Sequence, residues 1–385
     1  MAKTITILGS TGSIGKNVVE IIKVELEKYQ IIALTAKENF QELISQALIL
    51  KPLFVVIENK KHYQIVKDAL SQINNCQVMS GTESINEIAK IKCDILFSAI
   101  VGSAGVLPTL NAIKAGSNIA IANKESLVVA GDIIMEEVKK SKINLLPIDS
   151  EHNAIFQIFE QDNLNNIEKI TITASGGPFF RNQKDPENIT IEEALKHPNW
   201  QMGAKISIDC ATMMNKGLEM IEAYRLFPVA KSQLKILIHP QSIIHGMVEY
   251  KDGSSLAMLS YPDMKTPISY ALEFPKRLDL YQYQLIKKFD LAKINKLEFF
   301  EVDYLQFPAV KLCMQALETE GSALVVLNGA NEVAVNKFLN KEIAFDKITT
   351  IIEKSLNQIN HRKLSTIEEI IACDKQARTI ANSIF

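Results

Sequence analysis

The fold of this chain is decided by residues 3–15, KTITILGSTGSIG. Alternating apolar residues predict a buried strand from Lys3 to Leu8, and three evenly spaced glycines predict a tight turn into a helix that ends near Glu27. Such a turn lets backbone N–H groups approach a pyrophosphate at the helix N-terminus. The stretch therefore predicts a dinucleotide site, with a plain structural turn as the less favoured alternative.

The second predicted strand, Ile31–Thr35, carries the signal for the type of cofactor. NAD sites usually place an acid at this strand tip for the ribose hydroxyls, whereas this tip carries Thr35. Lys37 just beyond it could pair with the 2′-phosphate of NADP, although the charge of Glu38 opposes that role. The pattern favours NADP.

Further apolar runs alternate with helical stretches after the first two strands. They are Leu53–Ile57, Asp94–Ala99, Asn118–Ala122 and Asn144–Ile148. This order predicts a doubly wound parallel sheet. Polar residues follow two of the runs, at 123–126 and at 149–153, where such sheets bind ligands at the carboxyl ends of their strands.

The segment Ile148–Glu151 offers two carboxylates to one cation. If it is still extended, the side chains of Asp149 and Glu151 fall on the same side of the strand. Oxygen ligands of this kind suit Mg²⁺ or Mn²⁺. The alternative is a helix start that Asp149 or Ser150 caps, and the fragment alone does not decide between the two.

Residues 197–219, HPNWQMGAKISIDCATMMNKGLE, gather polar and aromatic groups in one span. Residues 197–203 have no periodicity and hold the only tryptophan, Trp200, so we interpret them as a lid loop. A helix is predicted over Ala211–Phe227, with Lys216 next to Glu219 at i,i+3. This helix start could hold a phosphate on one side and a metal on the other. The alternative is a solvated surface pair.

The remaining sequence predicts a second, partly antiparallel sheet and a helical end. Lys169–Thr173 predicts a strand that runs into a turn, where Ser175 could cradle an anion or serve only the turn. Thr190–Glu193 is a capping box. Residues 243–250 and 255–260 predict a hairpin, and the chain is predicted to be helical from Pro308, interrupted at 328–332 and capped by Ser365 and Glu368 before the last helix.

These changes of pattern predict an α/β fold of three domains. We expect a Rossmann-like cofactor domain over residues 1–149 and a catalytic and dimerisation α/β domain over 150–275. A linker over 276–299 and a helical C-terminal domain over 300–385 would follow.

Composition excludes several classes of function. The net charge of −2 over 385 residues and the absence of a basic stripe argue against a nucleic-acid partner. The longest uncharged run, Ile95–Ile113, is broken by glycine and proline, so no membrane segment is predicted. Five widely spaced cysteines without a CxxC pair suggest reduced thiols. The N-terminus predicts a strand at once, without a leader, so we expect a cytoplasmic protein.

Seven motifs together make the sequence resemble the 1-deoxy-D-xylulose 5-phosphate reductoisomerase family nearly from end to end. They are GSTGSIG, ANKES, DSEHNAIFQ, ASGGPF, HPNWQMGAKIS, ATMMNKGLE and HPQSIIH. The resemblance implies an enzyme that rearranges 1-deoxy-D-xylulose 5-phosphate and reduces the resulting aldehyde with NADPH, giving 2-C-methyl-D-erythritol 4-phosphate for isoprenoid synthesis. It also implies a homodimer, which the exposed hairpin at 243–260 would allow.

The resemblance further implies roles for single residues. The metal ligands would be Asp149, Glu151 and Glu219, and these three with Lys124 would be the catalytic residues. The substrate residues would be Ser150, Glu151, Ser175, His197, Trp200, Cys210, Asn215, Lys216 and Glu219. The NADPH residues would be Thr11, Gly12, Ser13, Ile14, Lys37, Asn39, Asn123, Glu125 and Gly203. One Mn²⁺ or Mg²⁺ would act as a Lewis acid on the ketone and the adjacent hydroxyl.

Two positions depart from the family pattern. The family often shows Gly-Lys-Asn after the second strand, whereas this chain has Lys37-Glu38-Asn39. Cys210 stands where the family usually has a serine near the phosphate, and Lys216 could lower the pKa of its thiol, unless the thiol points into apolar packing. Two other functions stay open as alternatives, a catalytically silent NADP-binding sensor and a metal-dependent phosphohydrolase.

Overall fold

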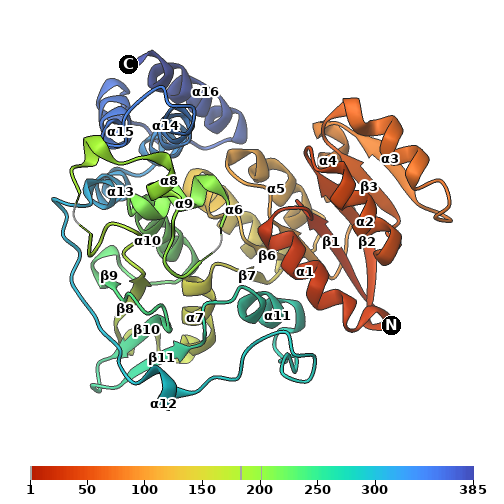
Figure 1. Cartoon of the computed structure of the whole chain (residues 1–385), viewed down its shortest axis with the longest axis horizontal. Coiled ribbons are helices and arrows are strands. Elements are labelled where there is room, and N and C mark those ends of the chain that lie inside the picture. Colours follow the sequence, from red (N-terminus) through yellow and green to blue (C-terminus); the bar gives the residue numbers. More distant parts are fainter. Residues whose placement is uncertain (1, 183, 201) are drawn as a thin grey trace. The chain divides into compact units, whose positions relative to one another are not determined.

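The structure, a computed structural model, describes residues 2–182, 184–200 and 202–385 (Figure 1). The chain divides into two compact units. Unit 1 is Met1–Asn123, Ile134–Asn153 and Asp263–Lys288, and unit 2 is Lys124–Ile133, Ala154–Pro262 and Phe289–Phe385. The boundaries of the three expected domains stay a prediction.

A seven-stranded parallel sheet forms the centre of unit 1. In spatial order its strands are β4 (Gln77–Ser80), β3 (Phe54–Ile57), β2 (Tyr29–Ala36), β1 (Lys3–Leu8), β5 (Ile95–Ser98), β6 (Asn118–Ile121) and β7 (Leu145–Pro147). The order reverses beside β1, which places the ligand crevice of a doubly wound sheet at the β1 turn. The Rossmann-like fold is therefore confirmed. Strand β4 was not predicted, because its sequence, QVMS, is only partly buried and contains no apolar run.

Helices follow the strands of unit 1 in the expected alternation. They are α1 (Ser13–Lys23), α2 (Phe40–Leu50), α3 (Tyr63–Ala69), α4 (Thr82–Ala89), α5 (Val106–Lys114) and α11 (Lys265–Glu273). Val18, Ile21 and Ile22 of α1 are fully buried, because i, i+3 and i+4 spacing puts them on one face of the helix. Although α11 comes late in the chain, it packs against α1, β6 and β7.

Two helices cross the boundary between the units. Helix α6 (Lys124–Ser141) has a non-helical residue, Ala130, and its part from Lys124 to Ile133 belongs to unit 2. Helix α7 (Ser150–Ile158) begins in unit 1 and continues in unit 2.

The start of α7 corrects the prediction of an extended segment at Asp149–Glu151. Strand β7 ends at Pro147, and the N–H of Asn153 donates to the carbonyl oxygen of Asp149 at 2.8 Å, so the helix begins at once. In a helix, side chains at i and i+2 point apart, whereas those at i and i+3 are neighbours. The alternative of a helix start, which the fragment left open, is correct.

A four-stranded mixed sheet lies in unit 2. In spatial order its strands are β11 (Ser255–Leu259), β10 (Ile244–Tyr250), β8 (Ile167–Ala174) and β9 (Leu234–Ile238). The β10–β11 hairpin is confirmed, and β10 is also antiparallel to β8, while β8 and β9 are parallel.

Helices make up the rest of unit 2. They are α8 (Ile191–Ala194), α9 (Ala204–Ala211), α10 (Met214–Leu226), α12 (Leu291–Ile294), α13 (Pro308–Thr319), α14 (Ser322–Leu339), α15 (Lys347–Gln358) and α16 (Ile367–Ser383). The nearly all-buried α14 packs against α13, α15 and α16, which confirms the helical C-terminal part (Figure 1). The capping box of α8 is confirmed, with the Glu193 N–H donating to the Thr190 hydroxyl.

The helix predicted over Ala211–Phe227 is confirmed as α10, but it begins later than predicted, at Met214, and Ala211 is the last residue of α9. Met213 has a φ of 59°, in the left-handed region, and separates α9 from α10. The Thr212 hydroxyl donates to the carbonyl oxygen of Ile208 and accepts the N–H of Met214, which gives the backbone an alternative to a continuous helix. Helix α9 itself was not predicted.

Two predictions for the C-terminal part were wrong. Residues 328–332 do not interrupt a helix but lie inside α14, because Asn328 and Asn331 are buried there and Gly329 packs close to α16. The last helix is capped by Thr366 and Glu369, one residue later than predicted. None of the helices in the described part of the chain combines the length and the apolar character that a membrane crossing needs.

Candidate active site

The turn between β1 and α1 is shaped for an anion at the N-terminus of α1. Gly9 has a φ of +85°, and a Cβ there would lie 2.7 Å from the carbonyl oxygen of Ala99, so a side chain does not fit. The buried Thr35 hydroxyl accepts the Gly9 N–H at 2.9 Å, and the Thr35 carbonyl oxygen accepts the Ser10 N–H at 2.8 Å. Thr35 thus fixes this turn. No side chain caps α1 at Gly12, which leaves its first N–H groups to a phosphate.

The predicted cofactor residues of unit 1 lie near carboxyl ends of its strands. Thr11, Gly12, Ser13 and Ile14 follow β1, Lys37 and Asn39 follow β2, and Asn123 follows β6. Asn39 caps α2 by accepting the N–H of Glu42 at 3.2 Å. The amide of buried Asn123 donates to the carbonyl oxygens of Ile100 and Gly102 and so ties the end of β6 to the loop after β5.

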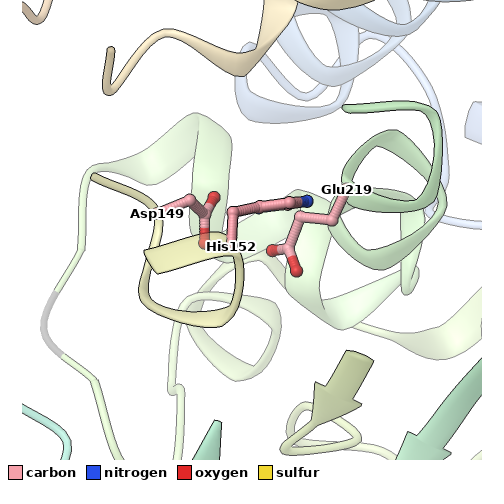
Figure 2. Close-up of side chains that lie close together, drawn as sticks. All are labelled: Asp149, His152 and Glu219. Atoms are coloured by element: carbon pink, nitrogen blue, oxygen red, sulfur yellow. The ribbon is translucent and has the colours of Figure 1, made fainter. Parts of the chain in front are cut away.

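Metal-ligating side chains gather at the start of α7. An oxygen of Asp149 and a ring nitrogen of His152 lie within 4.8 Å of each other, as expected for neighbours at i,i+3 (Figure 2). The Ser150 hydroxyl donates to the carboxylate of Glu151 instead. Fully buried His152 had no role in the sequence analysis, because the extended prediction placed it on the other side of the chain from Asp149.

Glu219 on α10 lies in a buried polar cluster of unit 2. The Lys124 ammonium donates to Glu219 at 3.1 Å and to the Asn215 side-chain oxygen at 2.8 Å. Lys216 and the Asn215 amide both donate to the Glu219 carboxylate as well. Lys216 is 5% and Glu219 1% exposed, so the alternative of a solvated surface pair is wrong.

This cluster brings together side chains that are far apart in sequence. Lys124 stands at the start of α6, and Asn215, Lys216 and Glu219 lie on the first turns of α10. Ionised groups are buried at a high cost unless opposite charges and hydrogen bonds compensate. Two ammonium groups close to one carboxylate also create a positive field that suits a phosphorylated ligand.

Ser175 and His197 form a second polar pair in unit 2. The Nε2 atom of His197 lies 2.8 Å from the Ser175 hydroxyl oxygen. Its Nδ1 atom accepts the N–H groups of Asn199 and Trp200 at 3.2 and 3.0 Å, so Nε2 carries the proton of the neutral ring. Burial first, and Lys216 second, lower the pKa of His197 to about 4. The Ser175 oxygen also accepts the Gly177 N–H at 3.2 Å, so its own hydrogen can donate to an anion.

Family comparisons match almost the whole chain. The description "1-deoxy-D-xylulose 5-phosphate reductoisomerase" matches residues 5–131, that of its C-terminal domain matches 145–227, and "DXP reductoisomerase C-terminal domain" matches 259–380. The reductoisomerase of Zymomonas mobilis is 44% identical over 383 residues, which cover 99% of this chain and 97% of the relative. That of Clostridium tetani is 46% identical over 376 residues, 97% of each chain.

The chain belongs to the 1-deoxy-D-xylulose 5-phosphate reductoisomerase family. A solved structure of the Zymomonas mobilis enzyme in complex with NADPH is similar with a TM-score of 0.93 and 42% identity, covering 100% of this chain and 99% of that one. A DOX-P reductoisomerase in complex with NADPH, fosmidomycin and magnesium is similar with a TM-score of 0.91 and 38% identity, covering 99% and 98%.

The chain is an NADPH- and divalent-metal-dependent oxidoreductase that converts 1-deoxy-D-xylulose 5-phosphate to 2-C-methyl-D-erythritol 4-phosphate. The comparisons do not support a silent NADP-binding sensor or a metal-dependent phosphohydrolase.

Cys210 of the reductoisomerase lies in the last turn of α9 and is partly exposed. Burial raises the pKa of its thiol well above the ordinary value, and the opposing effect of Lys216 and Lys124 is smaller. The expectation of a lowered pKa is therefore wrong, because loss of solvent outweighs the lowering effect of Lys216. The group is a neutral thiol. All five cysteines are free.

The predicted lid loop, residues 197–203, includes Gln201, which lies outside the described residues. The Asn199 amide donates to the carbonyl oxygen of Pro240 and to the Ser242 hydroxyl at 2.7 and 2.8 Å. The Trp200 ring lies edge-on to His245, with 6.2 Å between the ring centroids. The loop thus packs on the β9–β10 connection, and its role as a lid stays a prediction.

A buried ion network around Lys205 was missed by the sequence analysis. Its ammonium lies 2.7 Å from carboxylate oxygens of both Glu125 and Asp209, and the Asn331 amide on α14 donates to Asp209 at 2.9 Å. Burial alone would lower the pKa of Lys205, but the two carboxylates raise it, so the lysine stays charged. The i,i+4 spacing of Lys205 and Asp209 was the available signal, and it was lost because α9 was not recognised. Gly203, another predicted cofactor residue, is the N-cap of α9.

Proposed function

We propose that Asp149, Glu151 and Glu219 hold one Mg²⁺ or Mn²⁺ in the reductoisomerase reaction of this chain. Three carboxylates match the preference of both cations for oxygen ligands. Bound there, the cation would act as a Lewis acid on the ketone and the adjacent hydroxyl of the sugar phosphate. The buried setting of Glu219 is the observation that carries the proposal, since a carboxylate with 1% exposure on a short polar helix start is costly without a function.

Lys124 and Ser150 contact the reacting end of the substrate in this proposal. The Lys124 ammonium already lies between Asn215 and Glu219, so it needs little reorganisation to hold a developing negative charge on a substrate oxygen. Asn215 keeps this lysine in place. The loss of either partner would free a long side chain to leave the site.

The phosphate of the substrate binds to the polar groups around the N-terminus of α10 and the β8 turn. These are Ser175, His197, Trp200, Cys210, Asn215 and Lys216. The Ser175 hydroxyl and the neutral His197 ring form one rigid donor unit, because the backbone N–H groups of Asn199 and Trp200 fix the ring. Phosphate binding away from the reacting carbons supplies energy to order the 197–203 loop and exclude water.

NADPH binds at the β1 turn through Thr11, Gly12, Ser13 and Ile14, with Lys37, Asn39, Asn123, Glu125 and Gly203 as further contacts. The uncapped N-terminus of α1 fits the pyrophosphate, since its first N–H groups point out of the helix start. The Glu125 carboxylate also accepts a hydrogen bond from the Lys205 ammonium at 2.7 Å, which fixes its position. It therefore orients the nicotinamide half of the cofactor from a fixed position.

Oxidation of NADPH by the purified chain tests this proposal. We expect it to require both 1-deoxy-D-xylulose 5-phosphate and Mn²⁺ and to stop when a chelator removes the metal. Samples without the sugar phosphate control for background oxidation. NADPH oxidation without metal in the folded protein would contradict the proposed ligand set.

A homodimer and a cytoplasmic location are further parts of the proposal. The strand β11 is paired on one side only in the described sheet, which leaves an edge for a second copy. Sedimentation at micromolar concentration is expected to give twice the mass of the chain, and a monomer would exclude the dimer. Five free thiols fit a reducing compartment.

A further inference from the structure

An open polar groove lies at the carboxyl ends of β2, β3 and β4 in unit 1. Its lining residues are Lys37, Glu38, Glu58, Asn59, Lys60, Gly81, Thr82 and Glu83. The groove follows the strand next to the β1 turn, where a dinucleotide-binding sheet receives the adenosine half of its cofactor. Of these three strand ends, the sequence analysis assigned a cofactor role only to the end of β2.

Glu38 takes the middle position of the Lys37-Glu38-Asn39 segment, where the family often carries the lysine of Gly-Lys-Asn. An exposed carboxylate facing the 2′-phosphate of NADPH would repel it. The departure therefore requires either a weaker preference for NADPH or a different arrangement of charges in the groove.

The structure shows Glu38 engaged by donors of the next loop. The Asn59 amide donates to its carboxylate at 2.7 Å, and the Nε2 atom of His62 lies 3.4 Å from the same oxygen. The ring of His62 stacks on Phe40 with 4.5 Å between centroids, which holds it in place. The bond from Asn59 is the main cause of the lowered pKa of Glu38. Glu38 is therefore ionised and held against the 3-10 helix Lys60–His62.

Lys60 brings a positive charge to the groove from the end of β3. Gly81 has a φ of +90°, and a Cβ there would lie 2.9 Å from the Lys60 Cε atom, so the lysine stem lies across this glycine. Within the described residues, no carboxylate lies within 4.0 Å of the ammonium of Lys37 or Lys60. Glu58 receives the Thr82 hydroxyl at 3.4 Å. Among the described residues, Lys37 and Lys60 line the groove without an ion-pair partner, and of its three carboxylates, Glu38, Glu58 and Glu83, Glu38 is held by Asn59 and His62.

We propose that Lys60 and Lys37 recognise the 2′-phosphate of NADPH in this chain, and that Asn59 and His62 hold Glu38 away from it. The positive charge that the family places between β2 and α2 has moved to the neighbouring strand end. Lys60 is thus a determinant of specificity for NADPH over NADH. These contacts keep the preference for NADPH, although Glu38 stands where the family often has a lysine.

Calorimetric titration with 2′,5′-ADP and with 5′-AMP tests this proposal, because the two ligands differ only in the 2′-phosphate. For Lys60→Gln we expect the Kd for 2′,5′-ADP to rise roughly tenfold, the low end for a hydrogen bond to a charged group. The Kd for 5′-AMP is expected to stay within about twofold. Lys37→Gln is expected to act in the same direction, and the double variant to lose most of the difference between the two ligands.

Lys61→Gln is the matched control, since it removes the same charge from the adjacent exposed residue, which does not line the groove. Equal changes in Lys60→Gln and Lys61→Gln would overturn the proposal. The variant Glu38→Gln tests whether Asn59 and His62 hold Glu38 away from the phosphate. A change in the Kd for 2′,5′-ADP within about twofold supports this role, and a large gain in affinity for 2′,5′-ADP would show that Glu38 faces the phosphate.

This inference rests on the use of NADPH by the chain, and the binding experiments distinguish a wrong cofactor assignment from a wrong role of Lys60. If the unaltered chain binds neither 2′,5′-ADP nor NADPH, the cofactor assignment fails. If it binds both and Lys60→Gln leaves the preference unchanged, only the role of Lys60 is refuted.

Discussion

Lysine and glutamate side chains occur in two opposite settings in this molecule. In unit 2, Lys124, Lys216 and Glu219 are buried, and both lysines donate hydrogen bonds to Glu219. In unit 1, Lys37, Glu38 and Lys60 are exposed in an open groove. Interactions between the charges are therefore stronger in unit 2 than in unit 1, because water screens the exposed charges of unit 1 and not the buried charges of unit 2. The buried set is suited to chemistry and the exposed set to choosing between cofactors.

The comparison predicts that substitutions are costly in the first setting and mild in the second. Breaking a buried ion pair usually costs about 3–5 kcal/mol, whereas an exposed pair contributes about 0–1 kcal/mol. The Lys205 network of unit 2 belongs to the first class.

The largest expected effect on stability is that of Asp209→Asn. It leaves Lys205 with one of its two carboxylates and replaces the charged acceptor of Asn331 by a neutral one, so the free energy of unfolding should fall by about 3 kcal/mol. Urea denaturation measures the change. Glu87→Gln is the control, because it breaks an exposed ion pair with Lys90 and should cost less than about 1 kcal/mol. Equal changes in both variants would remove the distinction between buried and exposed charges.

The next largest effect is expected for Glu219→Gln, which removes one charge from the proposed ligands at nearly constant shape. We expect kcat/KM to fall by about 100-fold or more, while the circular dichroism spectrum stays unchanged. Glu249→Gln, which breaks the half-exposed pair with Lys169, is expected to keep its activity. Retained activity of Glu219→Gln at ordinary Mn²⁺ concentrations would remove Glu219 from the ligand set.

A comparison of Glu151→Gln with His152→Gln sharpens the metal site. The proposed ligand set predicts that Glu151→Gln raises the Kd for Mn²⁺ roughly tenfold and His152→Gln less. The neighbouring positions of Asp149 and His152 make the second variant a strict test. A larger effect of His152→Gln would assign the third ligand to the histidine.

Cys210→Ser is expected to have a smaller effect, on substrate binding. Because the thiol is neutral and a weak donor, a serine hydroxyl should lower the KM for the sugar phosphate by about three- to tenfold with little change in kcat. Steady-state kinetics at several substrate concentrations measure both constants. An unchanged or raised KM with an intact fold would show that the thiol does not contact the phosphate.

The smallest effect concerns His197 and acid. Its folded pKa of about 4 lies below the ordinary value of 6.5, so its contribution to stability is complete above pH 6.5 and is lost as the pH falls toward 4. NMR of the His197 ring hydrogens in the ligand-free folded chain should show no titration near pH 6.5, whereas the same ring in the urea-unfolded chain should titrate there. A native midpoint near 6.5 would contradict the buried neutral ring.

Much of unit 1 and the hairpin of unit 2 could be predicted, because both rest on local signals. Strands with period two, a glycine turn and a hairpin turn each lie within about ten residues. The break at Met213 could not be predicted, since the Thr212 hydroxyl competes with the helix only when the surrounding packing fixes it. Residues 328–332 read as a break because asparagine and glycine favour turns, but burial inside α14 overrides this propensity.

The residues of the candidate site were predicted largely from its motifs, but the contacts between its charged side chains were not. The sequence cannot show that Lys124 reaches Asn215, or that Lys205 joins α6, α9 and α14, because these contacts join distant segments. Likewise His152 escaped notice because its position beside Asp149 depends on where α7 begins.

Equilibrium binding of Mn²⁺, followed by electron paramagnetic resonance, tests the central claim that Asp149 and Glu219 serve one cation. The unaltered chain is predicted to bind one Mn²⁺ tightly. Asp149→Asn and Glu219→Gln should each raise the Kd for this ion by at least about tenfold, and the double variant should show no tight binding. Tight binding of Mn²⁺ by Glu219→Gln with the affinity of the unaltered chain would contradict the account.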